Sequence, residues 1–179
     1  MNIRANNRIR VLGIDPGSRV TGYGLLEFQN STFYYLDSGC IRTPKGSTSV
    51  RLGVIYQSLF EIIADNRPEQ VAIEEIFMAR NPQSALKLGQ ARGAAIAAVA
   101  TQGLEVSEYA ARKVKKAVTG VGGASKIQVQ HMVKVILGLS DTPGEDAADA
   151  LAVAICHVNM QAMRTATIVE QPEIQTFSA

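Results

Sequence analysis

Several features that would assign this chain to a specialised class are scarce or missing. Its 179 residues contain only two cysteines, Cys40 and Cys156, too few for a disulfide framework, so we expect reduced thiols in a cytoplasmic protein. The longest apolar stretch, around Gly93 to Ala100, is far too short to cross a bilayer, and the first ten residues lack the apolar segment of a signal peptide. We find no internal repeat and no low-complexity linker. These absences exclude a disulfide scaffold, a membrane-spanning protein and a repeat protein.

Acidic residues are absent between Ala110 and Lys134, whereas the chain as a whole is nearly balanced at a net charge of +2. The same segment contains six basic residues: Arg112, Lys113, Lys115, Lys116, Lys126 and Lys134. Such a segment is either a surface that binds polyphosphate or an ordinary solvated helix face, and its composition leaves both interpretations open.

The remaining composition is that of a globular domain. Hydrophobic residues make up 46% of the chain and charged residues 19%, which is enough apolar material for a full core. We therefore expect a single domain over residues 1–164. Residues 165–179 lack periodicity, and we expect them to form a flexible C-terminal tail.

The hydrophobic pattern predicts an α/β fold of five strands and five helices. The expected strands are Arg8–Ile14, Thr21–Phe28, Thr32–Arg42, Gln70–Glu74 and Leu104–Tyr109. The expected helices are Val50–Asn66, Ser84–Thr101, Ala110–Thr119, Lys126–Leu137 and Asp146–Arg164, with Ser125 as a cap. Three strands in a meander followed by helical crossovers predict a mixed five-stranded sheet with helices on both faces, the layout of a ribonuclease H-like fold.

Four acidic residues lie at positions where solvation does not explain them. Asp15 follows the apolar strand residues Val11 to Ile14, and Glu74 ends a second apolar strand. Asp146 and Asp149 are three residues apart on a predicted helix and therefore share one face. The same face continues into apolar residues, and alanines surround Asp149, so we expect this helix to approach the sheet closely with its acids directed inward.

Four converging carboxylates repel one another, and burial raises the cost of each charge. Bound cations relieve that cost, and oxygen ligands select Mg²⁺, with Mn²⁺ as a substitute. Four negative charges balance two divalent ions, and such a pair can activate a water and stabilise the leaving oxygen of a phosphodiester. The pattern therefore predicts a metal-dependent phosphodiesterase site.

Each acid also has a purely structural interpretation when it is taken alone. Asp15 precedes Pro16 and Gly17 and is typical of a turn residue, whereas Asp146 is typical of a helix N-terminus. The joint pattern of two strand-end acids and two helical acids favours a functional site. We interpret His131 and His157 as structural residues.

Long segments of the sequence resemble the RuvC-type Holliday-junction resolvases of bacteria. The resemblance runs from about Ile9 to His157 and rests on Gly13–Gly17, Thr21–Gly24, Ile73–Asn81, Ser84–Gly93, Gln128–Met132 and Asp146–Ala152. It implies a ribonuclease H-like fold, a homodimer and magnesium-dependent nicking of two opposing strands of a four-way DNA junction. It also implies cooperation with the RuvA–RuvB branch-migration machinery.

The resemblance further implies roles for individual residues. The metal-binding acids of the family match Asp15, Glu74, Asp146 and Asp149, whereas Glu75 and Glu145 match no family acid. Two basic positions that engage DNA match Lys115 and Lys126. An aromatic that stacks on bases at the opened crossover matches Phe77, although a core position is an equal alternative. Arg80 lies in the same predicted loop, and we expect it to contact DNA as well. The small residues of Ser84–Thr101 suit close packing, either on the sheet or across a twofold axis.

Three other functions remain open from the sequence. The segment from Asp15 to Gly22 is superficially similar to the phosphate loop of actin-like ATPases, but these need two lobes. The segment from Gly120 to Lys126 lacks the ending of a P-loop. A non-catalytic junction binder would use the acids only as helix caps. A related nuclease would act on RNA or on replication intermediates.

Overall fold

The computed structural model describes residues 8–75 and 81–169, with the side chains of residues 164–169 excepted. Five strands form one sheet in the order β3-β2-β1-β4-β5. The strands are β1 (Ile9–Asp15), β2 (Val20–Gln29), β3 (Thr32–Arg42), β4 (Gln70–Glu74) and β5 (Val106–Tyr109). The first three strands pair antiparallel, whereas β4 runs parallel to both β1 and β5. The predicted meander and mixed sheet are confirmed.

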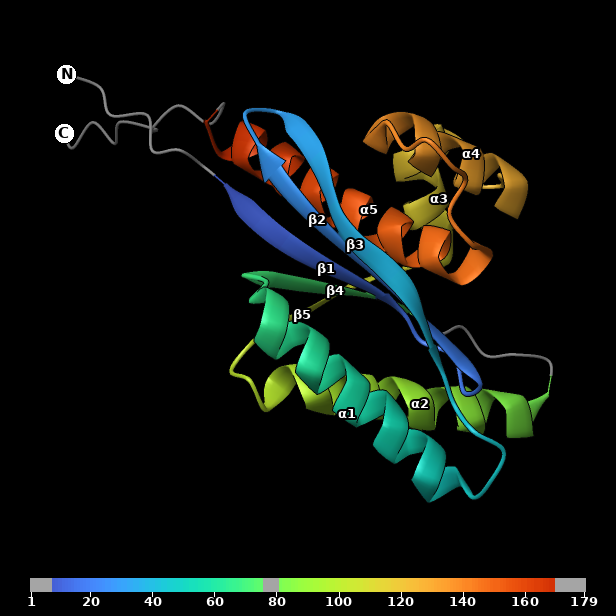
Figure 1. Ribbon diagram of the computed structural model, residues 1–179. Helices are drawn as coiled ribbons and strands as arrows, with labels where there is room; N and C mark the ends of the chain where they lie inside the picture. Colours follow the sequence, from blue (N-terminus) through green and yellow to red (C-terminus); the bar gives the residue numbers. More distant parts are fainter. Residues whose placement is uncertain (1–7, 76–80, 170–179) are drawn as a thin grey trace, which may run out of the picture.

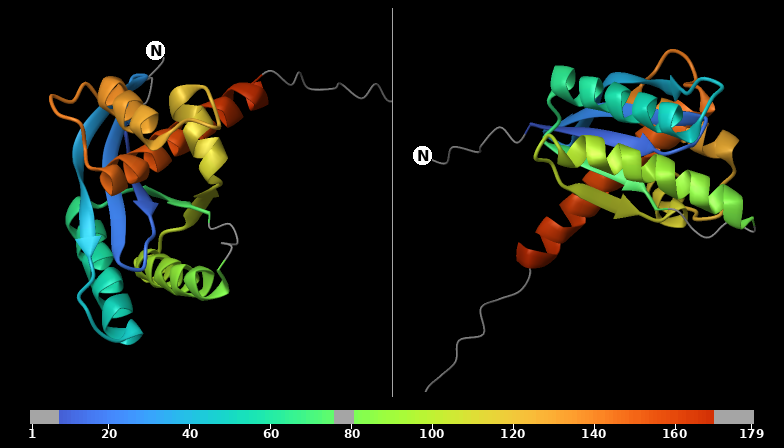
Figure 2. Two further views of the ribbon diagram at one scale, coloured as in Figure 1. Left: turned by 90° about the vertical axis from the view of Figure 1, so that its right-hand side faces the viewer. Right: turned by 90° about the horizontal axis from the view of Figure 1, so that it is seen from below.

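Five helices cover the two faces of this sheet (Figures 1 and 2). They are α1 (Thr48–Asn66), α2 (Pro82–Ala100), α3 (Ala111–Thr119), α4 (Lys126–Leu137) and α5 (Glu145–Val169). Helices α1 and α2 lie on one face, and α5 crosses the other face with α3 and α4 packed on it. Within the described residues, no helix combines the length and apolar character that crossing a membrane requires.

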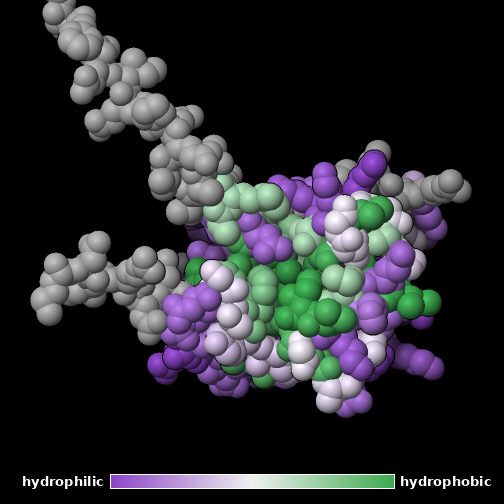
Figure 3. All heavy atoms as spheres, turned by 90° about the horizontal axis from the view of Figure 1, so that it is seen from above, coloured by the Kyte–Doolittle hydropathy of each residue, from purple (hydrophilic) through white to green (hydrophobic). Residues whose placement is uncertain are grey.

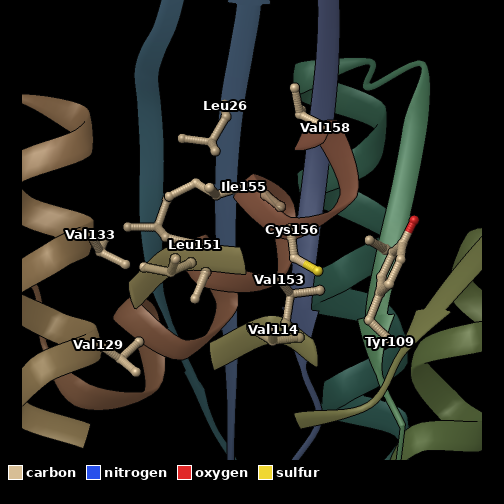
Figure 4. Close-up of a cluster of buried hydrophobic side chains, with 14 of the residues drawn as sticks. Leu26, Tyr109, Val114, Val129, Val133, Leu151, Val153, Ile155, Cys156 and Val158 are labelled. Atoms are coloured by element: carbon tan, nitrogen blue, oxygen red, sulfur yellow. The ribbon is translucent and has the colours of Figure 1, made fainter. Parts of the chain in front are cut away.

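Alternation along the strands divides the core into two clusters. Leu12, Ile14 and Ile73 point toward α1 and α2, where they meet the buried alanines of α2. Val11 and Ala72 point toward α5, whose residues from Leu151 to Val158 contribute many buried side chains to that cluster. Figure 4 shows Leu151, Val153 and Ile155 of α5 within this layer, together with Val114 of α3 and Val129 of α4.

Apolar side chains also reach the surface on the α5 side of the sheet. Figure 3, which views the molecule from that side, shows a group of hydrophobic residues at the centre of the surface. Phe33, Met132 and Ile136 are partly buried and pack against the cluster beneath α5. The hydrophobic cluster therefore continues to the surface beside α5.

Two helix ends show how the sequence sets element boundaries. Ser125 caps α4 as predicted, and a capping box forms because the Gln128 side chain accepts a hydrogen bond from the Ser125 backbone N–H. Helix α5 continues to Val169, so the expected end at Arg164 was wrong for this helix. Neither glycine nor proline occurs after Arg164 until Pro172, and the sequence therefore contains no residue that stops the helix there.

Helix α5 packs on the sheet at a distance that only glycine permits beneath it. A Cβ atom on Gly13 would lie 2.1 Å from the Ala150 carbonyl oxygen, and one on Gly22 would lie 2.0 Å from the Asp146 carbonyl oxygen. A Cβ atom on Gly24 would meet Leu151 at 2.7 Å. The predicted close approach of an alanine-rich helix therefore depends equally on glycines in β1 and β2, which sequence reasoning did not single out.

We expect Gly13→Ala to destabilise the protein by about 3 kcal/mol, because the new methyl group meets helix backbone that cannot rotate away. Urea denaturation measures the loss. Gly53→Ala is the matched control, since Gly53 lies on the exposed side of α1 and its Cβ would meet nothing within 4 Å. That substitution should stabilise the protein by about 0.5–1 kcal/mol. Equal effects of the two substitutions would contradict the packing argument.

Candidate active site

Strand pairing places Asp15 and Glu74 side by side. The two residues end β1 and β4, which run parallel with Ile14 opposite Ile73 one position earlier. Because side chains alternate along a strand, Asp15 shares the face of Val11 and Gly13, and Glu74 shares the face of Ala72. Both carboxylates therefore lie at the C-terminal ends of the parallel strands β1 and β4, on the face of the sheet that α5 covers.

Helix α5 contributes the other two acids from its N-terminal end. Asp146 lies in the first turn, and Asp149 follows one turn later on the same side. Val153 and Cys156 continue this side and are completely buried, as predicted. The close contact between Gly22 and the Asp146 backbone fixes the height of this end of α5 above the sheet.

One pocket unites most of the residues predicted for the site. It has a volume of about 240 Å³ and is lined by Asp15, Glu74, Ala111, Val114, Lys115, Lys126, Val129 and Asp149. Three of the four acids and both predicted lysines thus line a single cavity between the sheet edge, α3, α4 and α5. Asp146 is not part of its lining, and its Oδ2 atom lies 4.0 Å from the Cys40 thiol sulfur.

The electrostatics of the pocket are those of crowded carboxylates. Burial raises the pKa of Asp15 to about 7, and the charges of Glu74, Asp149 and Asp146 add to that rise. Burial also raises the pKa of Glu74, with a further contribution from Asp149. The pKa of Asp149 rises for the same first reason, although the ammonium of Lys126 opposes it. The site therefore holds more negative charge than its own lysines compensate.

The donor chemistry fits a hard divalent cation. Carboxylate oxygens are the preferred ligands of Mg²⁺ and Mn²⁺, and a cation would lower the cost that the raised pKa values express. As placed in the described part of the chain, no three His, Cys, Asp or Glu side chains are grouped tightly enough to enclose an ion. Small side-chain movements within the pocket are therefore part of any metal binding there.

The two lysines of the pocket have different surroundings. Lys126 begins α4, and its Nζ atom pairs with Glu145 and lies 3.6 Å from Oδ2 of Asp149. Lys115 extends from α3 into the pocket. The rest of the predicted basic segment on α3 is exposed, and the Nζ atom of Lys113 lies 5.4 Å from the ring centre of Tyr109. The structure thus separates two pocket lysines from a solvated helix face.

The turn after β1 and the first turn of α5 test the structural roles that the sequence allowed for Asp15 and Asp146. Thr21 closes the turn after β1, because its hydroxyl donates to the Gly17 carbonyl and accepts from the Gly17 N–H. The hydrogen bonds of this turn therefore come from Thr21 and Gly17, whereas Asp146 does occupy a favourable first-turn position. Phe77 and Arg80, which we expected to contact DNA, lie outside the described residues.

His157 occupies a structural position, as interpreted from the sequence. The Tyr109 hydroxyl lies 2.9 Å from its Nδ1 atom, and its Nε2 atom lies 2.7 Å from Oε1 of Gln70. Because an amide oxygen only accepts, Nε2 carries the proton and Nδ1 accepts from Tyr109. Burial lowers the pKa of His157, which keeps this neutral form. The three side chains link α5 to β4 and β5, and His131 is exposed on α4.

We expect Asp15→Asn to stabilise the metal-free protein at pH 8. The raised pKa of Asp15 means that the folded state holds a proton that the unfolded chain releases above about pH 4. Wild-type stability therefore falls as the pH rises from about 4 through 7, and the substitution removes this loss. The melting temperature in EDTA should rise by about 3–8 °C at pH 8 and should change little at pH 4. Asp65→Asn, at an exposed position on α1, is the control, and a pH-independent effect of Asp15→Asn would contradict the assignment.

Most of the chain is similar to proteins of one known family. The family profile described as "Crossover junction endodeoxyribonuclease RuvC" matches residues 11–157. A protein of that name from Marinobacter nauticus is 60% identical over 150 residues, which cover 84% of this chain and 86% of that protein. Another from Pectobacterium atrosepticum is 56% identical over 164 residues, with 90% and 96% coverage.

Solved structures confirm the predicted ribonuclease H-like fold. The structure described as "T. thermophilus RuvC in complex with Holliday junction substrate" is 36% identical, with a TM-score of 0.82 and coverage of 88% of this chain and 97% of that chain. The yeast mitochondrial Holliday junction resolvase Ydc2 shares the fold at 16% identity and a TM-score of 0.65. The matched region holds all four predicted acids and both pocket lysines, and the chain belongs to the RuvC family of crossover junction endodeoxyribonucleases.

Proposed function

We propose that this protein resolves Holliday junctions in recombination and DNA repair by nicking two opposing strands of a four-way DNA junction. The observation that carries the proposal is the single pocket in which acids from β1, β4 and α5 meet lysines from α3 and α4. Acids that hold metal and lysines that hold phosphate together suit metal-dependent phosphodiester hydrolysis. The structure of the Thermus thermophilus relative in complex with a Holliday junction substrate supports this choice of DNA.

We further propose that Asp15, Glu74, Asp146 and Asp149 hold Mg²⁺, with Mn²⁺ as a substitute and two ions in the complete site. When bound, the metal supplies an activated water and charge stabilisation for the leaving oxygen. Side chains of the protein bind the DNA backbone and exclude bulk water. Lys115 and Lys126 bind backbone phosphates at the pocket, and the buried strand ends beneath the acids keep bulk water from screening them.

The exposed side of α2 bears on the assembly of the protein. We expect a homodimer, and the outward side of α2 supports it, because Gly89 and Gly93 leave the backbone open beside the exposed Leu86. Cooperation with RuvA–RuvB and a DNA contact by Phe77 stay predictions that rest on the resemblance. A cytoplasmic location stays a prediction from the low cysteine content, and a DNA contact by Arg80 stays a prediction from its place in the same loop. We also propose that residues 1–164 form one nuclease domain.

Magnesium-dependent nicking of a synthetic four-way junction should be lost when any one of the four acids is neutralised. The four substitutions are Asp15→Asn, Glu74→Gln, Asp146→Asn and Asp149→Asn. Junction binding should stay largely intact, because the acids hold metal and the lysines hold DNA. Gel assays of cleavage and of binding measure the two effects separately, and EDTA should stop the wild-type reaction. Asp65→Asn is the control for loss of a carboxylate elsewhere. A variant of any of the four acids that cuts at the wild-type rate would remove that residue from the site, and preferential cleavage of RNA would favour the related-nuclease alternative.

Lys115→Gln and Lys126→Gln should weaken junction binding and reduce its salt dependence. Each lost phosphate contact lowers the slope of log K against log salt by about 1. A binding series between low and physiological salt measures this slope. Arg67→Gln is the matched control, because Arg67 is exposed just beyond the end of α1, near the start of β4 and away from Glu74 at its end. Unchanged slopes for both lysine variants would contradict a phosphate role.

A further inference from the structure

Glu145 is an acid beside the site that neither the family pattern nor the pocket lining includes. It begins α5, one residue before Asp146 and four before Asp149, so that it lies on the same side of the helix as Asp149. Its carboxylate pairs with Nζ of Lys126, and both side chains are more than half exposed, at 53% and 58%. Asp149 is only 21% exposed. Glu145 therefore stands at the outer rim of the pocket, and Asp149 stands inside it.

Lys126 is shared between these two acids. Its ammonium touches Glu145 and also lies 3.6 Å from Oδ2 of Asp149. Its charge offsets part of the negative charge of the pocket, because it lowers the pKa values of Asp15, Glu74 and Asp149 against the effect of burial. The lysine thus partly occupies the electrostatic role that a metal ion would take.

Metal binding and this lysine contact compete for one carboxylate. A divalent ion on Asp149 would lie within a few ångströms of the ammonium, where like charges repel strongly in a partly buried site. The lysine must then leave Asp149, and an unpaired ammonium at the pocket mouth would oppose the ion. Glu145 is the neighbouring carboxylate that can receive it without a change in the backbone, because the contact already exists.

We infer that Glu145 is a positioning residue that holds the Lys126 ammonium at the rim of the pocket and so leaves Asp149 to the metal. The inference rests on the proposed metal site and goes beyond it, since it assigns a role to an acid that binds neither metal nor DNA. An exposed ion pair of this kind contributes little to stability. That weakness suits the role, because a backbone phosphate can later take the lysine from Glu145 with little loss.

A simpler explanation would give Glu145 only a through-space effect. Any additional negative charge near the acids attracts a divalent cation, with or without a lysine between them. The two explanations differ in whether the effect of Glu145 depends on Lys126. A double-mutant cycle measures that dependence directly.

The test is calorimetric titration of the full chain with Mn²⁺, without DNA, at pH 8. The variants are Glu145→Gln, Lys126→Gln and the double substitution, and thermal melting checks their folding. We expect Glu145→Gln to weaken Mn²⁺ binding about threefold to fivefold and Lys126→Gln to tighten it, as the size of an exposed pair implies. In the Lys126→Gln background, the second substitution should change affinity by less than about twofold.

An equal loss in both backgrounds, or no loss in either, would overturn the role of Glu145. Asp149→Asn in the same titration separates this inference from the proposed function. If the wild type binds no Mn²⁺, or if Asp149→Asn binds it as tightly as the wild type does, the metal site itself is wrong. If the wild type binds and Asp149→Asn does not, the cycle alone decides on Glu145.

Discussion

Mutual repulsion of carboxylates is the constraint around which this molecule is built. Asp15, Glu74 and Asp149 belong to three elements that are distant in the sequence, and each one has a raised pKa because the fold holds it in a crowded, partly buried place. Nothing in the acids themselves favours such proximity. The apolar clusters on the two faces of the sheet supply the free energy that keeps them together.

The close packing of α5 on the sheet brings Asp149 to the acids at the strand ends. Glycines in β1 and β2 allow the backbone of α5 to pack almost directly on the strands. The buried alanines of α5 have short side chains, so the helix side of the contact also permits this close approach. An acid on a helix that is farther from the sheet would not reach carboxylates at the strand ends. The small residues therefore determine where the acids lie, although none of them lines the pocket. The lysines of α3 and α4 offset only part of the negative charge of these acids.

Most of the framework could be predicted from the sequence because it follows from local patterns. The positions of Asp15 and Glu74 at the ends of apolar strands predicted that their carboxylates converge, and the spacing in α5 predicted that Asp149 lies on the buried side. The contact of Cys40 with Asp146 and the pairing of Glu145 with Lys126 could not be predicted, since they join residues 106 and 19 positions apart through tertiary packing. Gly13 was visible in the sequence, but its role depends on the distance between helix and sheet, which periodicity does not contain.

The buried link between His157, Tyr109 and Gln70 has a mechanical consequence. It joins α5 to two neighbouring strands at a point about two helical turns beyond Asp149, and it uses both ring nitrogens of the imidazole. Helix α5 is hydrogen-bonded to the sheet at His157 and packs on Gly13 and Gly22 near its N-terminal end. These two contacts leave the helix little freedom to translate along the sheet or to rotate about its axis. Motion in the pocket is therefore confined to side chains, above all the exposed Lys126 and Glu145 at its mouth, while the backbone that carries the acids keeps its position.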